Sequence, residues 1–184
     1  MDRSDVLRLL REPGTAEVLA LRFVPTLFWR DLVEVGLDLR VRPTVRRAAD
    51  RQLVARLPGL AVGEKTAIAR RASPRVLERL RHDPSPRVVR ALLENPRATE
   101  GLLLPLVSHE EARPEVLEEV ARSRRWGARY EVRLALCHNP RTPAVIALRL
   151  LPYLRKADLR RLLREVRVPA VVRRRAEVLL GAAT

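Results

Sequence analysis

Prolines divide this chain into short segments, and they constrain its fold more than any other sequence feature. Proline suits the first turn of a helix, because its φ is already near the helical value and its missing N–H is not needed there. A serine or threonine before the proline can cap the free amides of that turn. Five dipeptides therefore predict helix starts: Ser73-Pro74, Ser85-Pro86, Arg113-Pro114, Thr142-Pro143 and Val168-Pro169.

A second set of prolines predicts where helices end. Proline disfavours the α conformation in the residue before it, so Asn95-Pro96 and Asn139-Pro140 are expected to end the preceding helices. Between these points apolar residues recur at i, i+1, i+4 and i+5, as in Val88, Val89, Leu92 and Leu93. This spacing is typical of an amphipathic helix, and no strand-like alternation competes with it. The sequence predicts an all-α fold of short helices.

Helices this short are not stable alone. Each buries only about five apolar side chains, worth roughly 1.5 to 3 kcal/mol apiece, against an ordering cost of about 1 to 2 kcal/mol per residue. Neighbouring helices must cover one another's apolar faces, and the regular recurrence of helix starts predicts that they stack in chain order. The expected starts are residues 74 and 86, near 99, 114, near 127, 143, near 158 and 169.

The recurrence is irregular in one place. Asn95-Pro96-Arg97 and Asn139-Pro140-Arg141 lie 44 residues apart, which leaves room for three helices. Pro143 and Pro169 lie 26 residues apart, which leaves room for two. Either a three-helix unit interrupts a series of helix pairs, or the stretch from Thr99 to Val107 is an insert, and the sequence leaves both interpretations open.

Two blocks carry a resemblance to a known family. VVRALLENPRAT (88–99) and VRLALCHNPRTP (132–143) each combine a valine-arginine helix, a closing Asn-Pro and a Thr or Pro that starts the next helix. From Lys65 to Leu180 the chain resembles HEAT-like and leucine-rich-variant α-helical repeats. The resemblance implies a right-handed α-α superhelix (HEAT/ARM-like solenoid) that serves as a binding scaffold. Some variant-repeat proteins hold an iron–sulfur cluster on several cysteines, but this chain has only Cys137, so no cofactor is implied.

The N-terminal part departs from this pattern. Helices are expected at Asp5–Arg11 and Thr15–Leu21, around a turn at Pro13-Gly14, followed by a segment rich in aromatic residues. We interpret residues 1–42 as a helical cap that seals one end of the stack, and residues 43–184 as the repeat solenoid. The alternative for the aromatic segment is that Phe28 and Trp29 form a docking patch for a partner or a second subunit.

Charge is the second strong signal. The chain has 37 basic and 22 acidic residues, a formal net charge of +15, and 35 of the basic residues are arginine. A coding bias would favour arginine over lysine but would not produce the surplus over acids. Because the guanidinium group suits carboxylates and phosphates, the surplus predicts an acidic macromolecular partner, in the first place a protein. Sequence-independent contact with DNA or RNA phosphates is the alternative.

The basic residues are concentrated near the C-terminus. The helix expected from Asp158 to Val166 would bury Leu159, Leu162, Leu163 and Val166, and leave its arginines facing solvent. The competing interpretation is that such arginines pair with glutamates on the next helix, each surface pair contributing about 0 to 1 kcal/mol. The predicted anion-binding residues are Arg87, Arg90, Arg129, Arg133, Arg155, Arg160, Arg161, Arg164, Arg173 and Arg174.

One segment combines basic and aromatic residues. If a single helix carries both Trp126 and Tyr130, the two rings lie one turn apart beside Arg125 and Arg129, an arrangement that can stack on a base. The alternative is that Trp126 fills a helix junction where Gly127 permits close approach, with Tyr130 packed beneath it. Aromatic residues make up only 3% of the chain, which argues against an extended base-stacking platform.

The remaining residues suggest no catalysis. His82, His109 and His138 are isolated in the sequence, His138 beside Cys137 lacks the spacing of a zinc site, and Cys137 is expected to be a packed residue. A DNA glycosylase on such a fold would need an acidic residue near clustered aromatics, and Trp29 and Trp126 lie far apart. We expect no enzymatic activity.

The sequence also bears on localisation. Without a signal-peptide core or a membrane-spanning run, and with one cysteine, a cytoplasmic protein is expected. The sequence leaves the oligomeric state open.

Overall fold

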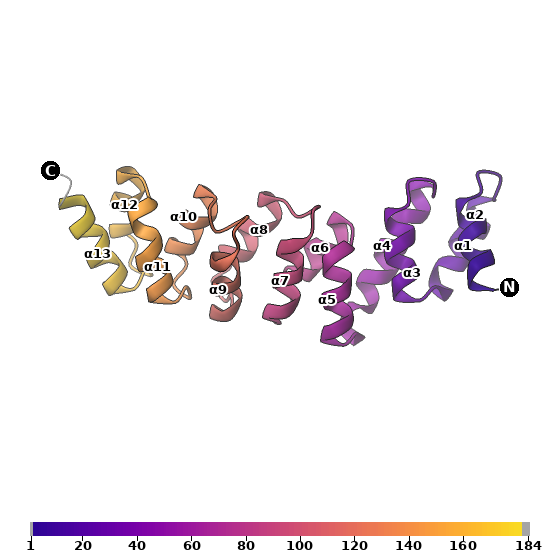
Figure 1. The fold of residues 1–184 in the computed structure, drawn as a ribbon, viewed down its shortest axis with the longest axis horizontal. Helices are drawn as coiled ribbons and strands as arrows, with labels where there is room; N and C mark the ends of the chain where they lie inside the picture. The colour runs from indigo at the N-terminus through magenta and orange to yellow at the C-terminus, as the bar shows by residue number, and fades with distance from the viewer. Residues whose placement is uncertain (1, 182–184) are drawn as a thin grey trace.

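The computed structural model describes residues 2–181, and in this range the chain is all-α (Figure 1). It contains 13 α-helices, three short 3-10 helices and, among the described residues, no strand. The helices follow one another in chain order along the long axis, with the two ends of the chain at opposite ends of the molecule (Figure 1). The predicted all-α fold of short helices is confirmed.

The helix bounds are as follows. The α-helices are α1 (Arg3–Arg11), α2 (Glu17–Phe23), α3 (Trp29–Leu37), α4 (Pro43–Arg56), α5 (Val62–Arg71), α6 (Pro74–Leu80), α7 (Pro86–Glu94), α8 (Glu100–Val107), α9 (Pro114–Arg122), α10 (Tyr130–His138), α11 (Ala144–Leu150), α12 (Lys156–Leu163) and α13 (Ala170–Gly181). The 3-10 helices η1 (Val24–Thr26), η2 (Leu57–Gly59) and η3 (Leu151–Tyr153) directly continue α2, α4 and α11.

Helices two apart in sequence pack side by side, and this arrangement produces two rows. Odd-numbered helices pack as α3 on α5, α5 on α7, α7 on α9, and α11 on α13. Even-numbered helices pack as α2 on α4, α4 on α6, α8 on α10, and α10 on α12. Successive helices such as α3 and α4, or α12 and α13, also pack against each other and join the rows. Each helix thus covers its apolar face with a few near neighbours in sequence.

The apolar core runs along the molecule between these helices. One cluster extends from Val6 in α1 to Leu136 in α10, and a second from Cys137 to Ala176 in α13. Leu150 of α11 packs against both clusters. Residues of the expected N-terminal cap share the first cluster with those that follow, so the core has no break at residue 42.

The proline pattern predicted most helix boundaries. Helices α6, α7 and α9 begin at Pro74, Pro86 and Pro114, and Asn95 and Asn139 follow the ends of α7 and α10. The expected serine and threonine caps before proline are wrong: neither Ser73 nor Ser85 makes a side-chain cap hydrogen bond, and Thr142 Oγ1 is buried without a partner, with α11 starting one residue after Pro143. Extended backbone before proline is therefore sufficient to start these helices.

Several details differ from the sequence-based expectation. Helices α3 and α5 were not expected from the sequence. In α5 the buried residues are Ile68 and Ala69, which are too few to form a recognisable apolar stripe. Helix α12 ends at Leu163, so Val166 is 84% exposed rather than buried. After Leu163 the chain turns, with the Glu165 amide donating to the Leu162 carbonyl (3.2 Å) and the Val168 amide to the Glu165 carbonyl (3.3 Å), and Val168 is buried in place of Val166.

The stretch whose role was open is a helix of the even row. Helix α8 buries Leu102, Leu103, Leu106 and Val107 and packs on α10. It carries Pro105 in its interior, and Thr99 caps its first turn by accepting from the Leu102 amide at 3.3 Å. The interpretation as an irregular insert is therefore wrong.

Buried asparagines join the stacked helices at their C-terminal ends. Asn95, after α7, is fully buried, and its Nδ2 donates to the carbonyls of Ala69 (2.8 Å) and Ala72 (3.2 Å) at the end of α5. Asn139, after α10, donates in the same way to Val107 (2.5 Å) and His109 (2.9 Å) at the end of α8. These bonds supply donors to carbonyls at and just after helix ends, where the helix itself offers few partners.

The same contact is made elsewhere by other donors. Arg56, at the end of α4, donates to the carbonyls of Leu27 (2.6 Å) and Pro25 (2.5 Å), after α2. Following α9, Arg125 donates to Asn95 and Ala98 at 3.0 Å each, beyond the end of α7. In four places, therefore, the end of one helix is capped by the end of the helix two positions later.

Replacing Asn95 by alanine leaves the carbonyls of Ala69 and Ala72 without their donor in a buried site. A buried unsatisfied polar group costs about 1–3 kcal/mol, so we expect N95A to lower the free energy of unfolding by about that amount, measured by urea denaturation. N139A should behave alike. The exposed Glu12 follows α1 and provides the control: E12A should change stability by less than about 0.5 kcal/mol. Equal effects of the three substitutions would contradict a capping role.

Candidate functional site

Arginines stack on aromatic rings around the start of α10. We call this group the arginine–aromatic cluster; it brings together five of the predicted residues and two others. The guanidinium carbons lie 4.4–5.1 Å from the ring centroids. Its members are Arg125, Trp126, Arg129, Tyr130, Arg133, Tyr153 and Arg155.

Trp126 is the buried centre of this cluster. It precedes α10, so one helix does not carry both Trp126 and Tyr130. The ring is 1% exposed, its Nε1 donates to the Leu93 carbonyl at 2.9 Å, and Arg125 and Arg129 lie over it. Trp126 thus fills the junction between α9 and α7, as in the second of the two alternatives that the sequence left open, but Tyr130 packs against the second core cluster and not beneath Trp126.

Gly127 makes this junction possible. A Cβ at this position would lie 2.4 Å from the Ala121 carbonyl oxygen and 3.0 Å from that of Ser123. Both are backbone atoms, which cannot rotate away as a side chain can. The glycine is therefore required for the chain to pass so close to the end of α9.

Tyr130 and Asp158 join α10 to α12. The Tyr130 hydroxyl donates to Asp158 and accepts from the Arg155 amide at 3.0 Å. Burial, followed by the bond to Asp158, raises the pKa of Tyr130, which keeps its hydroxyl a donor at neutral pH. Asp158 is buried in the first turn of α12 and serves as an acceptor for Tyr130 rather than as the cap of its own helix.

Tyr153 has the ring of the cluster that is most open to solvent. Arg125, Arg129 and Arg155 are exposed around the rings. Tyr153 is 62% exposed, and the Arg133 guanidinium lies 4.8 Å from its ring centroid while donating to the Gly127 carbonyl at 2.9 Å. Arg155 lies over the Tyr130 ring at 4.6 Å. Tyr153 was not singled out in the sequence, because it lies 23 residues from Tyr130 and nothing local links the two.

The predicted arginines differ in their partners: a first group, which includes Arg129 of the cluster, contacts acidic residues, a second group is exposed, and Arg173 belongs to neither. Arg90 forms a bidentate bond with Glu119 on α9 (2.7 and 2.6 Å), Arg129 bonds Glu100 of α8 (2.8 Å), and Arg161 lies 3.8 Å from Asp158. The half-buried Arg173 has a buried Nε without a hydrogen-bond partner. The second group is exposed and, within residues 2–181, forms no ion pair: Arg87, Arg160, Arg164 and Arg174.

The two N-terminal aromatics have different surroundings. Trp29 is buried, and its Nε1 donates to Glu64 of α5 at 2.8 Å, with Arg30 over its ring. Phe28 is 55% exposed and lies 5.6 Å from Trp29 between ring centroids. Of the predicted docking pair, only Phe28 presents its ring to solvent.

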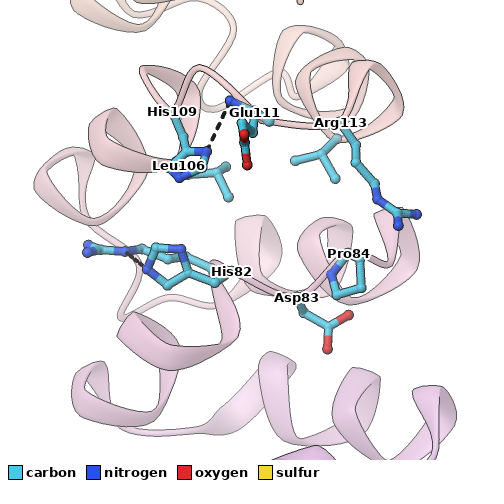
Figure 2. A pocket seen from close by; sticks show the side chains of 10 residues that line it. His82, Asp83, Pro84, Leu106, His109, Glu111 and Arg113 are labelled. Carbon is cyan, nitrogen blue, oxygen red and sulfur yellow. Dashed lines mark hydrogen bonds between the residues drawn. The ribbon is translucent and has the colours of Figure 1, made fainter.

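A small pocket of about 160 Å³ lies between the turn after α6 and the loop after α8 (Figure 2). Figure 2 shows His82 and His109 on facing sides of this pocket. Their ring centroids are 6.5 Å apart in an edge-on arrangement. The two histidines were considered isolated because 27 residues separate them in sequence. They meet because the turn after α6 faces the loop after α8 across the pocket.

The pocket histidines already use one ring nitrogen each. His82 Nε2 accepts from Arg81 Nε at 3.1 Å, and His109 Nδ1 accepts from the Glu111 amide at 3.2 Å. Burial, then the charges of Arg81 and Arg79, lower the pKa of His82, so its ring is neutral at pH 7. Within residues 2–181, no group of three or more His, Cys, Asp or Glu side chains is placed to hold a metal ion.

Comparison with protein-family models, curated proteins and solved structures finds no match to this chain. Among the described residues, no helix is both long and apolar enough to cross a membrane. Inferences about function therefore rest on the geometry of the chain itself.

Replacing Gly127 by alanine should destabilise the protein strongly, because the new methyl group would overlap the Ala121 carbonyl. We expect a loss of about 2–4 kcal/mol in the free energy of unfolding, in the range of other overpacked or strained sites. The matched control is G63A in α5, where a Cβ meets no atom within 4 Å. G63A should stabilise the protein by about 0.5–1 kcal/mol through helix propensity. A neutral G127A would contradict the junction as described.

Cys137 should be unreactive in the folded protein. The side chain is buried, and burial raises the pKa of its thiol to about 12, so almost no thiolate forms at pH 8. We expect a disulfide reagent to modify Cys137 only after unfolding in urea. The control is an A128C variant, which adds a thiol at an exposed position. In the native A128C protein one thiol should react about as fast as thiols do in the unfolded protein. Rapid modification of native wild-type protein would refute this expectation.

Proposed function

We propose that this chain is a non-enzymatic α-helical repeat protein, a right-handed α-α superhelix of the HEAT-like or leucine-rich-variant type. Chain-order stacking in two rows and the recurrence of the buried Asn at residues 95 and 139 support the repeat. In this proposal it binds an acidic macromolecule, in the first place a protein, through its arginine-rich surface.

One observation carries the binding proposal. In the segment from Arg155 to Arg175 both acidic residues already have partners within the fold: Asp158 bonds Tyr130 and lies 3.8 Å from Arg161, and Glu165 bonds His138 at 2.8 Å. Arg160 and Arg164 therefore keep their guanidinium groups exposed, with no carboxylate of this segment left to neutralise them. Arg174 of α13 is also exposed, with Glu177 as its nearest acidic residue on that helix. Such groups can bind and steer an anionic partner.

The alternative is binding to DNA or RNA through phosphates, which the same guanidiniums would suit. Protein is the preferred partner class because Trp126 is buried and Arg155 lies over the Tyr130 ring, so that Tyr153 is the one largely exposed ring of the cluster and there is no surface with a row of open rings. Binding to single-stranded nucleic acid without sequence preference usually uses such surfaces.

The test is titration of fluorescently labelled polyglutamate and of a labelled DNA duplex at several salt concentrations. We expect polyglutamate to bind more tightly than the duplex at equal salt. The triple variant R160Q/R161Q/R164Q should weaken polyglutamate binding at least about tenfold, or about 1.4 kcal/mol. Circular dichroism should show unchanged helix content.

The control variant R22Q/R71Q/R124Q removes the same charge from exposed arginines elsewhere. It should lower affinity much less, because bulk charge acts only through screened long-range attraction. Equal losses in the two variants would reduce the effect to net charge and overturn the proposed surface. Tighter binding of the duplex, with a steep salt dependence, would favour the nucleic-acid alternative.

A further inference from the structure

A second basic surface lies far from the C-terminal arginines, in a groove between α4 and α6. The groove has a volume of about 490 Å³. Arg51, Val54 and Ala55 form its α4 side, and Arg75, Glu78 and Arg79 its α6 side, with His82 at one end. His82 also lines the pocket of Figure 2, so the two hollows meet at this residue.

The groove carries uncompensated positive charge. Arg51, Arg75 and Arg79 are exposed, and within residues 2–181 none of them forms an ion pair. Glu78 is the single acidic residue of its lining. The nearby Asp50 is buried; burial raises its pKa, while Arg75 and Arg46 act in the opposite direction. Because His82 is neutral at pH 7, the charge of the groove resides in three guanidiniums facing one carboxylate.

The spacing of these groups sets what fits between them. Arg75 and Arg79 are one helical turn apart on α6, which places their Cβ atoms about 5–6 Å apart. Arg51 comes from the opposite wall, and Val54 and Ala55 supply apolar surface near it. In an extended peptide, side chains at i and i+2 point to the same side about 6.5–7 Å apart, so alternate carboxylates match the two arginines of α6.

We propose that the α4–α6 groove binds an acidic segment of a partner protein, in extended form, with carboxylates at alternate positions. This site consists of residues outside the surface assigned under the proposed function and does not depend on it. The three arginines outnumber Glu78, and this positive excess provides the attraction. The arginines on the two walls can form bidentate hydrogen bonds to carboxylates.

A nucleic acid suits the groove less well. Helix α6 has seven residues, a length of about 10 Å, which spans few phosphates. The lining contains no Phe, Tyr or Trp on which a base could stack. The apolar wall from Val54 and Ala55 suits a peptide side chain better than a sugar-phosphate backbone.

The experiment uses a labelled eight-residue peptide of alternating Glu and Ala, with a Gln-Ala peptide as the uncharged control. Affinity is measured by fluorescence anisotropy, and the site is located by two-dimensional NMR of the ¹⁵N-labelled protein. We expect the Glu-Ala peptide to bind and the Gln-Ala peptide not to bind. The amide chemical-shift changes caused by the Glu-Ala peptide should be concentrated in residues 51–55 and 75–82. The variant R51Q/R79Q, which removes one arginine from each wall, should weaken binding at least about fivefold.

Two controls separate this proposal from the previous one. R22Q/R124Q has the same net charge as R51Q/R79Q and should keep the shifts in α4 and α6. R160Q/R161Q/R164Q should also keep them, even if it loses affinity for polyglutamate. Unchanged affinity in R51Q/R79Q, or shifts confined to α12 and α13, would overturn the groove proposal. A DNA duplex that displaces the peptide and shifts the same α4 and α6 amides more strongly would overturn the assignment to a protein.

Discussion

The structure depends on supplying donors to the carbonyls at the ends of many short helices. A helix of seven to ten residues leaves about as many carbonyls unpaired at its C-terminus as it pairs inside, and in four places such an end meets the end of the helix two positions later. Asn95, Asn139, Arg56 and Arg125 bond the end of the helix two positions earlier. The bonds fix the spacing of the rows as well as satisfying buried groups, because each donor reaches only if the two helix ends are adjacent.

Arginine has two different roles in this molecule, which explains how a chain of net charge +15 can fold compactly. Some guanidiniums bond helix ends, stack on Trp126 or Tyr130, or pair with acids of a neighbouring helix, as Arg90 does with Glu119. These contacts give one part of the guanidiniums partners inside the fold. Other guanidiniums, among them Arg160 on α12 and Arg51 and Arg79 in the α4–α6 groove, are exposed and form no ion pair within residues 2–181, and both proposed binding surfaces consist of such groups.

The candidate site was predicted only in part. The sequence singled out Trp126 and Tyr130, and Gly127 as the reason for close approach, but it could not choose between a stacking surface and a packed junction. That choice depends on α10 starting at Tyr130, which is set by packing against α8 and α12. His82 faces His109, and the groove beside Arg51 is lined by two helices. In both cases the residues are far apart in the sequence, so no local sequence pattern predicts that they meet.

The sequence by itself determined that the chain is helical, where α6, α7 and α9 begin, and that α7 and α10 end at asparagine. These features are local, because proline and apolar spacing act within one or two turns. Only the tertiary structure decided which arginines are bonded and which are free, and that Val166 lies outside α12. A guanidinium reaches several ångströms in any direction, so its partner is set by the helix that packs beside it and not by its neighbours in sequence.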